Sequence, residues 1–198
     1  MARSTKSLLR KIVLSNTYQM STFGSQLSLE KDPENQLFSR QNRRRLQAEA
    51  IRDAMLVSSG QISFHNPSLE KNRSLFHKIN RNKLPELFEV FDYPNPGLVS
   101  GNRNTSSVPT QALFMMNNEF VMKQAQLTTE LITKKQGLKL KEKNRLIFLT
   151  CLNREPRREE MDVSIRFLEE SKGKKSEDFR LDGLVHSLFA CLDFRYLN

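Results

Sequence analysis

The chain has 198 residues, of which 37% are hydrophobic and 27% are charged, so it can build a core, although a leaner one than average. Its 32 Lys and Arg against 22 Asp and Glu give a formal net charge of +10, which makes nucleic acid, anionic lipid or polysaccharide plausible partners. No apolar stretch approaches membrane-spanning length, and no export signal is visible. The chain also lacks phosphate-loop, dinucleotide, G-x-S-x-G, H-E-x-x-H and zinc spacings, which excludes the chemistries that need them.

The first expected helix is short, amphipathic and ends near residues 15–17. Its apolar residues follow helical spacing, and its other face is basic. The apolar residues are Leu8, Leu9, Ile12 and Val13, and the basic ones are Lys6, Arg10 and Lys11. The polar residues 20–35 that follow are expected to form a connection.

A longer helix is predicted over residues 36–59, followed by Gly60 as a natural residue to end it. Its apolar stripe recurs every three or four residues, at Leu46, Ala50, Ala54 and Val57. Residues 61–64 and 74–79 are compatible with a small β-hairpin, and residues 84–91 predict a short helix with Pro85 near its start.

About twenty residues, 91–110, then form a polar segment rich in Pro, Gly and Asn between two apolar helical patterns. A loop of this length is uncommon in a compact domain and is usually functional or disordered. We expect this one to be ordered, because it contains apolar side chains that can anchor it, namely Phe91, Tyr93, Leu98 and Val99. The arginine-rich part of the preceding long helix, residues 43–57, is expected to pack near this loop.

Pro109 is expected to start the next helix, which the pair Asn117-Asn118 interrupts. A Lys-rich linker at residues 134–145 leads into an apolar helical run, Pro156 begins a further helix, and the last helix carries an apolar face over residues 181–192. The chain is therefore predicted to be all-α, an irregular domain of about seven helices spanning residues 1–198. A break between two sub-lobes is allowed for at residues 134–145.

Four polar residues at the long loop are the candidate binding residues: Asp92, Arg103, Asn104 and Gln111. An Asp92–Arg103 pair could hold the loop, in which case these side chains are structural. Alternatively, the four line a pocket for an anion or a carbohydrate. No catalytic residue is assigned.

The second candidate is a basic patch of Arg43, Arg44 and Arg45, which could grip phosphates. Three consecutive arginines on a helix fan out over most of a turn, so they cannot all face one groove. Pairing with acidic residues of the fold is the alternative.

Two cysteines, Cys151 and Cys191, lie in apolar runs and are expected to be buried thiols, with a disulfide between two helices as the alternative. His186 lies beside the apolar stripe of the last helix and is expected to be a partly buried structural residue rather than a metal ligand. The sequence predicts no metal site and no cofactor in this chain.

Four segments resemble the planctomycete PSD domain, a domain of unknown function: residues 9–21, 32–53, 91–121 and 153–156. The resemblance covers nearly the whole chain in the right order. It implies a place at the C-terminal end of a large exported planctomycete protein, in the periplasm or at the cell surface. It also implies cytochrome-c-like modules upstream, so haem is implied for those modules only. The chain departs from the family pattern at three points. Gln36 stands where the family usually has Arg, Arg157 stands where it usually has Thr, and the chain has no Trp.

The expected function is therefore that of a non-catalytic structural or interaction module, with the long loop as its contact surface and other domains or proteins as its partners. One alternative is a hydrolytic or carbohydrate-active enzyme domain that uses Asp92 or a nearby carboxylate. The other is a nucleic-acid-binding protein that uses the basic surface.

Overall fold

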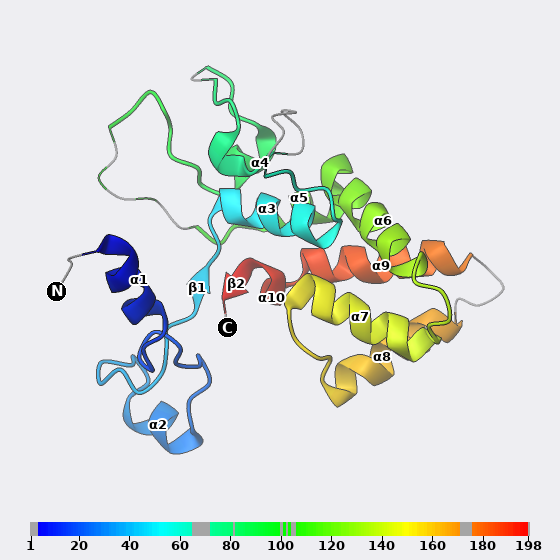
Figure 1. Cartoon of the computed structure of the whole chain (residues 1–198), viewed down its shortest axis with the longest axis horizontal. Helices are drawn as coiled ribbons and strands as arrows, with labels where there is room; N and C mark the ends of the chain where they lie inside the picture. The colour runs from blue at the N-terminus through cyan, green and yellow to red at the C-terminus, as the bar shows by residue number, and fades with distance from the viewer. Residues whose placement is uncertain are drawn as a thin grey trace. The chain divides into compact units, whose positions relative to one another are not determined.

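The computed structural model describes residues 4–64, 72–80, 82–99, 101, 103, 106–170 and 176–197. These residues form ten α-helices, one short 3₁₀ helix and one two-stranded sheet, which confirms the all-α class with more helices than the seven expected (Figure 1). In chain order the elements are α1 (Thr5–Val13), α2 (Gln26–Lys31), β1 (Arg44–Arg45), α3 (Ala48–Ser58), η1 (Ser74–Phe76), α4 (Glu86–Val90), α5 (Pro109–Asn117), α6 (Glu119–Thr133), α7 (Leu140–Leu152), α8 (Arg158–Glu170), α9 (Glu177–Ala190), α10 (Leu192–Arg195) and β2 (Tyr196–Leu197). None of the described helices is long and apolar enough to cross a membrane.

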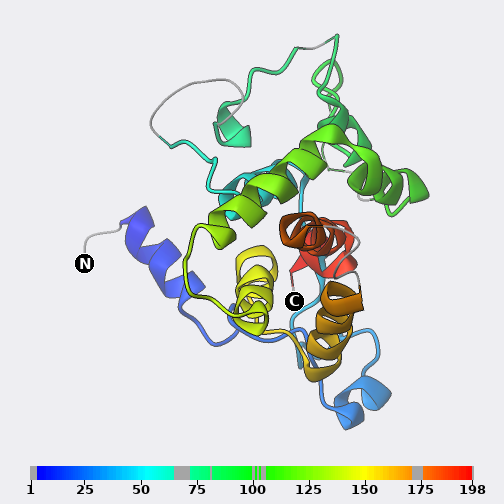
Figure 2. The same cartoon turned by 90° about the vertical axis from the view of Figure 1, so that its right-hand side faces the viewer.

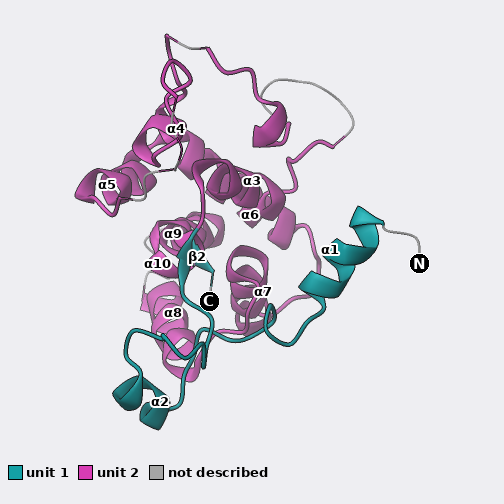
Figure 3. Ribbon diagram, turned by 90° about the vertical axis from the view of Figure 1, so that its left-hand side faces the viewer, with its two compact units in different colours: residues 1–45, 196–198 teal, residues 46–195 magenta. Residues whose placement is uncertain are grey.

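The chain divides into two compact units (Figure 3). Unit 1 comprises residues 1–45 and 196–198, and unit 2 comprises residues 46–195. The Lys-rich segment at residues 134–145 lies inside unit 2, and its last part already belongs to α7. That residues 1–198 fold as a single domain stays a prediction.

Unit 1 contains α1, α2 and the antiparallel pair β1–β2, in which Arg44 lies opposite Leu197 and Arg45 opposite Tyr196. Its irregular segment is held by two buried polar residues, Asp32 and Asn35. Both carboxylate oxygens of Asp32 accept backbone N–H groups, from Gln36 and Leu37. The Asn35 side chain donates to the carbonyl of Arg40, and Asn35 itself has a positive φ of 54°.

These bonds correct the prediction of a helix over residues 36–59. Asp and Asn side chains that bond to nearby backbone groups offer the chain an alternative to the helix. Phe38, with φ of 53°, also leaves the helical region. The helix therefore begins only at Ala48, and Arg44 and Arg45 lie in a strand. Residues 20–35, expected as a connection, contain the short helix α2.

The core of unit 2 is apolar and draws on most of its helices. Helix α6 packs along α9, and α7 and α8 lie beside α9 (Figures 1 and 2). Side chains spaced three or four residues apart are fully buried at this centre, including Ile51 and Met55 on α3, Val121 and Ala125 on α6, and Leu181 and Val185 on α9. This spacing is that of an amphipathic helix with one face in the core.

Local signals determine several helix boundaries in unit 2. Pro109 is the first residue of α5, where a missing N–H costs little. The Asn118 side chain accepts the backbone N–H of Phe120 and so starts α6 as a new helix. The break predicted at Asn117-Asn118 is confirmed.

The predicted hairpin over residues 61–64 and 74–79 is wrong. Ser74–Phe76 forms the 3₁₀ helix η1, and the bridge between Ser63 and Asn72 is parallel. The cause is a buried polar cluster on α3: Asp53 accepts both the N–H and the hydroxyl of Ser74, each at 2.7 Å. Arg52 donates to the Asn72 carbonyl at 2.8 Å. Residues 65–71, between these two segments, lie outside the described residues.

Candidate functional site: the loop base and the adjacent pocket

The two ends of the long loop are joined at Asp92. Its carboxylate accepts the backbone N–H of Ser106 at 2.8 Å and the hydroxyl of the same residue at 2.8 and 2.9 Å. Asp92 has a φ of 59°, in the left-handed region that Asp tolerates better than most residues. One side chain therefore closes a segment of thirteen intervening residues by bonds to a charged acceptor, which are stronger than neutral ones.

Gln111 reinforces this closure from α5. It is 1% exposed, and its amide nitrogen donates to the carbonyls of Val90 and Ser106 at 3.1 and 3.2 Å. The amide thus ties the end of α4 to the far side of the loop. The Gln111 side chain therefore holds backbone groups from both ends of the loop.

Aromatic stacking attaches the loop to α4. Tyr93 stacks on buried Phe88 with ring centroids 5.0 Å apart, and its N–H donates to the Phe88 carbonyl at 2.8 Å. The Arg103 guanidinium lies 5.7 Å from the centre of the Tyr93 ring. Arg103 also pairs with Glu49 on α3 at 2.9 Å and donates to Gln47. We call this set, Phe88, Asp92, Tyr93, Arg103, Ser106 and Gln111, the loop base.

The tip of the loop differs from its base. Leu98 and Val99 were expected to be anchors, but Leu98 is 71% exposed and Val99 is fully exposed. That expectation is wrong for both. The Asn95 side chain accepts the N–H of Gly97 at 2.8 Å, a local turn that shapes the approach to them. Asn104, the fourth candidate binding residue, lies outside the described residues.

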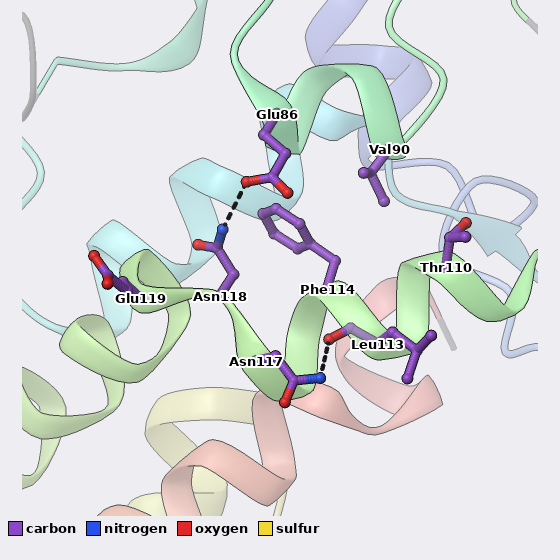
Figure 4. Close-up of a pocket in the computed structure, with 8 residues that line it drawn as sticks. All are labelled: Glu86, Val90, Thr110, Leu113, Phe114, Asn117, Asn118 and Glu119. Atoms are coloured by element: carbon purple, nitrogen blue, oxygen red, sulfur yellow. Dashed lines mark hydrogen bonds between the residues drawn. The ribbon is translucent and has the colours of Figure 1, made fainter.

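A pocket of about 700 Å³ lies next to the loop base, between α4 and the corner of α5 and α6 (Figure 4). The Phe114 side chain points from α5 toward α4, and Asn118 donates to Glu86 at 3.0 Å across the pocket. Thr110, Asn117 and Glu119 complete its polar lining. Carboxylates and amides beside an aromatic ring can hydrogen-bond a polyhydroxylated ligand, which is the chemistry expected for the carbohydrate alternative. The sequence reasoning missed this pocket, since its residues come from three helices.

The basic patch of Arg43, Arg44 and Arg45 has a different geometry from the expected helix. Arg44 and Arg45 are consecutive strand residues, so their side chains point to opposite faces. Arg43 lies over the Tyr196 ring at 5.5 Å from its centre. Arg44 and Arg45 are therefore separated by the alternation of a strand, rather than by the rotation of a helix.

The cysteines are buried or partly buried, and His186 contacts a backbone carbonyl. Cys151 and Cys191 are free thiols, and burial raises the pKa of each, so both stay protonated at neutral pH. The Nε2 atom of His186 lies 2.9 Å from the Met115 carbonyl, which ties α9 to α5. Within the described ranges, no group of three or more His, Cys, Asp and Glu is placed to hold a metal ion.

The segment Asn153-Arg154-Glu155-Pro156 forms the corner between α7 and α8. Asn153 ends α7 with a φ of 52°, in the left-handed conformation common at helix ends. Arg154 then donates to both carboxylate oxygens of Glu160, at 2.7 and 2.6 Å, and to Asp193 at 2.8 Å. Arg154 therefore connects α8 to α10.

Replacing Arg154 by Met should lower the free energy of unfolding at pH 7 by about 1–2 kcal/mol. Hydrogen bonds from Arg154 lower the pKa of Glu160 below its ordinary value. The pair therefore stabilises the fold at pH values above the pKa that Glu160 has in the unfolded chain, and this contribution is lost as the pH falls. Urea unfolding should thus show the difference between R154M and wild type shrinking below about pH 4. Arg145→Met, which removes the exposed pair with Glu155, is the control and should change little. A difference that stays constant down to low pH contradicts the assignment.

Comparison with known protein families gives a match over most of the chain. A family model described as PSD1, protein of unknown function (DUF1553), matches residues 2–168. Neither the curated proteins nor the solved structures include one that matches this chain significantly.

Proposed function

The chain belongs to the PSD1 family of proteins of unknown function, and we propose that it is a non-catalytic interaction module that contacts a partner protein with the tip of its long loop. As the resemblance to the planctomycete PSD domain implies, the module is part of an exported multidomain protein. Haem, in this proposal, belongs to other modules of that protein.

The observation that supports the proposal is the contrast between the base and the tip of the loop. The base uses polar side chains to hold backbone: Asp92 accepts from Ser106, and Gln111 donates to two carbonyls. The tip presents two neighbouring aliphatic side chains, Leu98 and Val99, to solvent. A rigid base reduces the entropy lost on binding, and exposed apolar side chains gain most from burial by a partner.

The same contacts favour binding over catalysis. An enzyme built on Asp92 would need that carboxylate to act on substrate, yet both of its oxygens accept bonds from Ser106. Arg103 is likewise engaged with Glu49 and the Tyr93 ring. Polar residues that hold the loop are thereby committed to structure, which leaves the apolar tip as the contact surface.

The test is photo-crosslinking in an extract of the source organism, with a photoreactive residue in place of Val99. We expect a discrete adduct, lost when Leu98→Asp is added, because a charge in the contact opposes its desolvation. The matched control places the same residue at Val57, 55% exposed on α3. L98D should leave thermal unfolding unchanged, since Leu98 is exposed. Adducts shared with position 57, or unaffected by L98D, contradict the proposal.

A further inference from the structure

Most of the net positive charge of this chain belongs to unit 1. Residues 1–45 and 196–198 contain nine Lys and Arg against three Asp and Glu, a net charge of +6. Residues 46–195 contain 23 against 19, a net charge of +4. The smaller unit is thus a strongly basic one, and its charge attracts anionic surfaces.

Within unit 1, helix α1 exposes an apolar face. Its aliphatic residues are 59%, 56%, 45% and 42% exposed, in the order Leu8, Leu9, Ile12 and Val13. The spacing i, i+1, i+4, i+5 places them on one side of the helix. The other side carries Lys6, Arg10 and Lys11, and the nine residues of α1 include no Asp or Glu.

The aliphatic face of α1 takes no part in a core. The buried residues of unit 1 within the described ranges are Asp32 and Asn35, both polar, and α1 has no buried residue. Leu14, directly after the helix, is 63% exposed. Exposed clusters of this kind mark interaction surfaces, because isolated surface apolar residues are common but contiguous ones are not.

We propose that α1 binds an anionic lipid surface. The helix lies flat at the boundary of headgroups and acyl chains, with Leu9 and Ile12 immersed and Lys6, Arg10 and Lys11 at the phosphates. Charge complementarity selects an anionic surface over a neutral one. The aliphatic character of the face selects lipid over nucleic acid, since bases stack on aromatic side chains and phosphates need no apolar face. This surface is separate from the proposed loop contact.

Co-sedimentation of the full chain with vesicles tests the proposal. Phosphatidylcholine vesicles with about 30% phosphatidylserine should bind the chain at least about tenfold more tightly than pure phosphatidylcholine. Ile12→Asp should reduce binding to the anionic vesicles by about tenfold or more, since a buried charge opposes insertion. The matched control is Val163→Asp, an exposed aliphatic residue on α8 of unit 2, which should bind as wild type does.

Other outcomes overturn the proposal. Equal binding to both vesicles, no binding, or unchanged binding of I12D would each do so. If light scattering shows a dimer that I12D dissociates, a second copy of the chain covers this face. If the chain binds only single-stranded DNA, and I12D binds it equally well, the surface is one for nucleic acid. Because Ile12 is exposed, circular dichroism of I12D should match wild type. The Val99 adduct should persist in I12D, so the two proposals can fail separately.

Discussion

Replacing Phe88 by Ala should lower the free energy of unfolding by about 3–5 kcal/mol, the cost of removing a fully buried aromatic ring. Phe88 is 0% exposed, contacts the His77 ring edge-on with centroids 5.7 Å apart, and stacks on Tyr93. Its removal leaves a cavity beneath the loop base and removes the support of Tyr93, over which Arg103 lies. Chemical denaturation followed by circular dichroism measures the effect.

The matched control for F88A is Phe76→Ala. Phe76 is 65% exposed on η1, so the same change there should cost less than about 0.5 kcal/mol. Equal losses in the two variants would mean that Phe88 does not lie in the core as described.

Replacing Asp92 by Ala should lower the free energy of unfolding by about 2–3 kcal/mol. The variant removes the charged acceptor of the Ser106 N–H and hydroxyl, and it also places Ala at a φ of 59°, where most side chains are strained. Denaturation of the purified variant measures this loss.

Asp92→Asn separates the two causes. Asn tolerates a positive φ and keeps one acceptor oxygen, so D92N should lose about half as much stability as D92A or less. If D92N and D92A are equally destabilised, the charge carries the effect and backbone strain does not. If neither variant loses stability, Asp92 does not close the loop.

The sequence predicted the helices whose signals are local. Pro109 and Asn118 mark helix starts by their own chemistry, so α5 and α6 could be found without tertiary information. Phe91 and Tyr93 were also correctly expected to anchor the loop. Boundaries set by distant contacts could not be found, as with β1, whose partner β2 lies about 150 residues away along the chain.

The candidate site was predicted in part. Asp92, Arg103 and Gln111 do lie around the loop, but their contacts depend on Ser106, Val90 and Glu49, and no spacing in the sequence links these residues. Composition alone could not tell a residue that binds backbone from one that binds a ligand, because both are polar. Nor could it tell that Leu98 and Val99 are exposed, since aliphatic residues in a loop serve equally as anchors and as contacts.

Amide hydrogen exchange followed by mass spectrometry tests the central claim, that a rigid base presents an exposed tip. The N–H groups of Tyr93 and Ser106 donate to Phe88 and Asp92, so we expect them to exchange much more slowly than amides at the tip. D92A should speed exchange at Ser106 while α6 and α9 stay protected. Rapid exchange at Tyr93 and Ser106 in the wild-type protein, at the rate of the tip, would contradict the account.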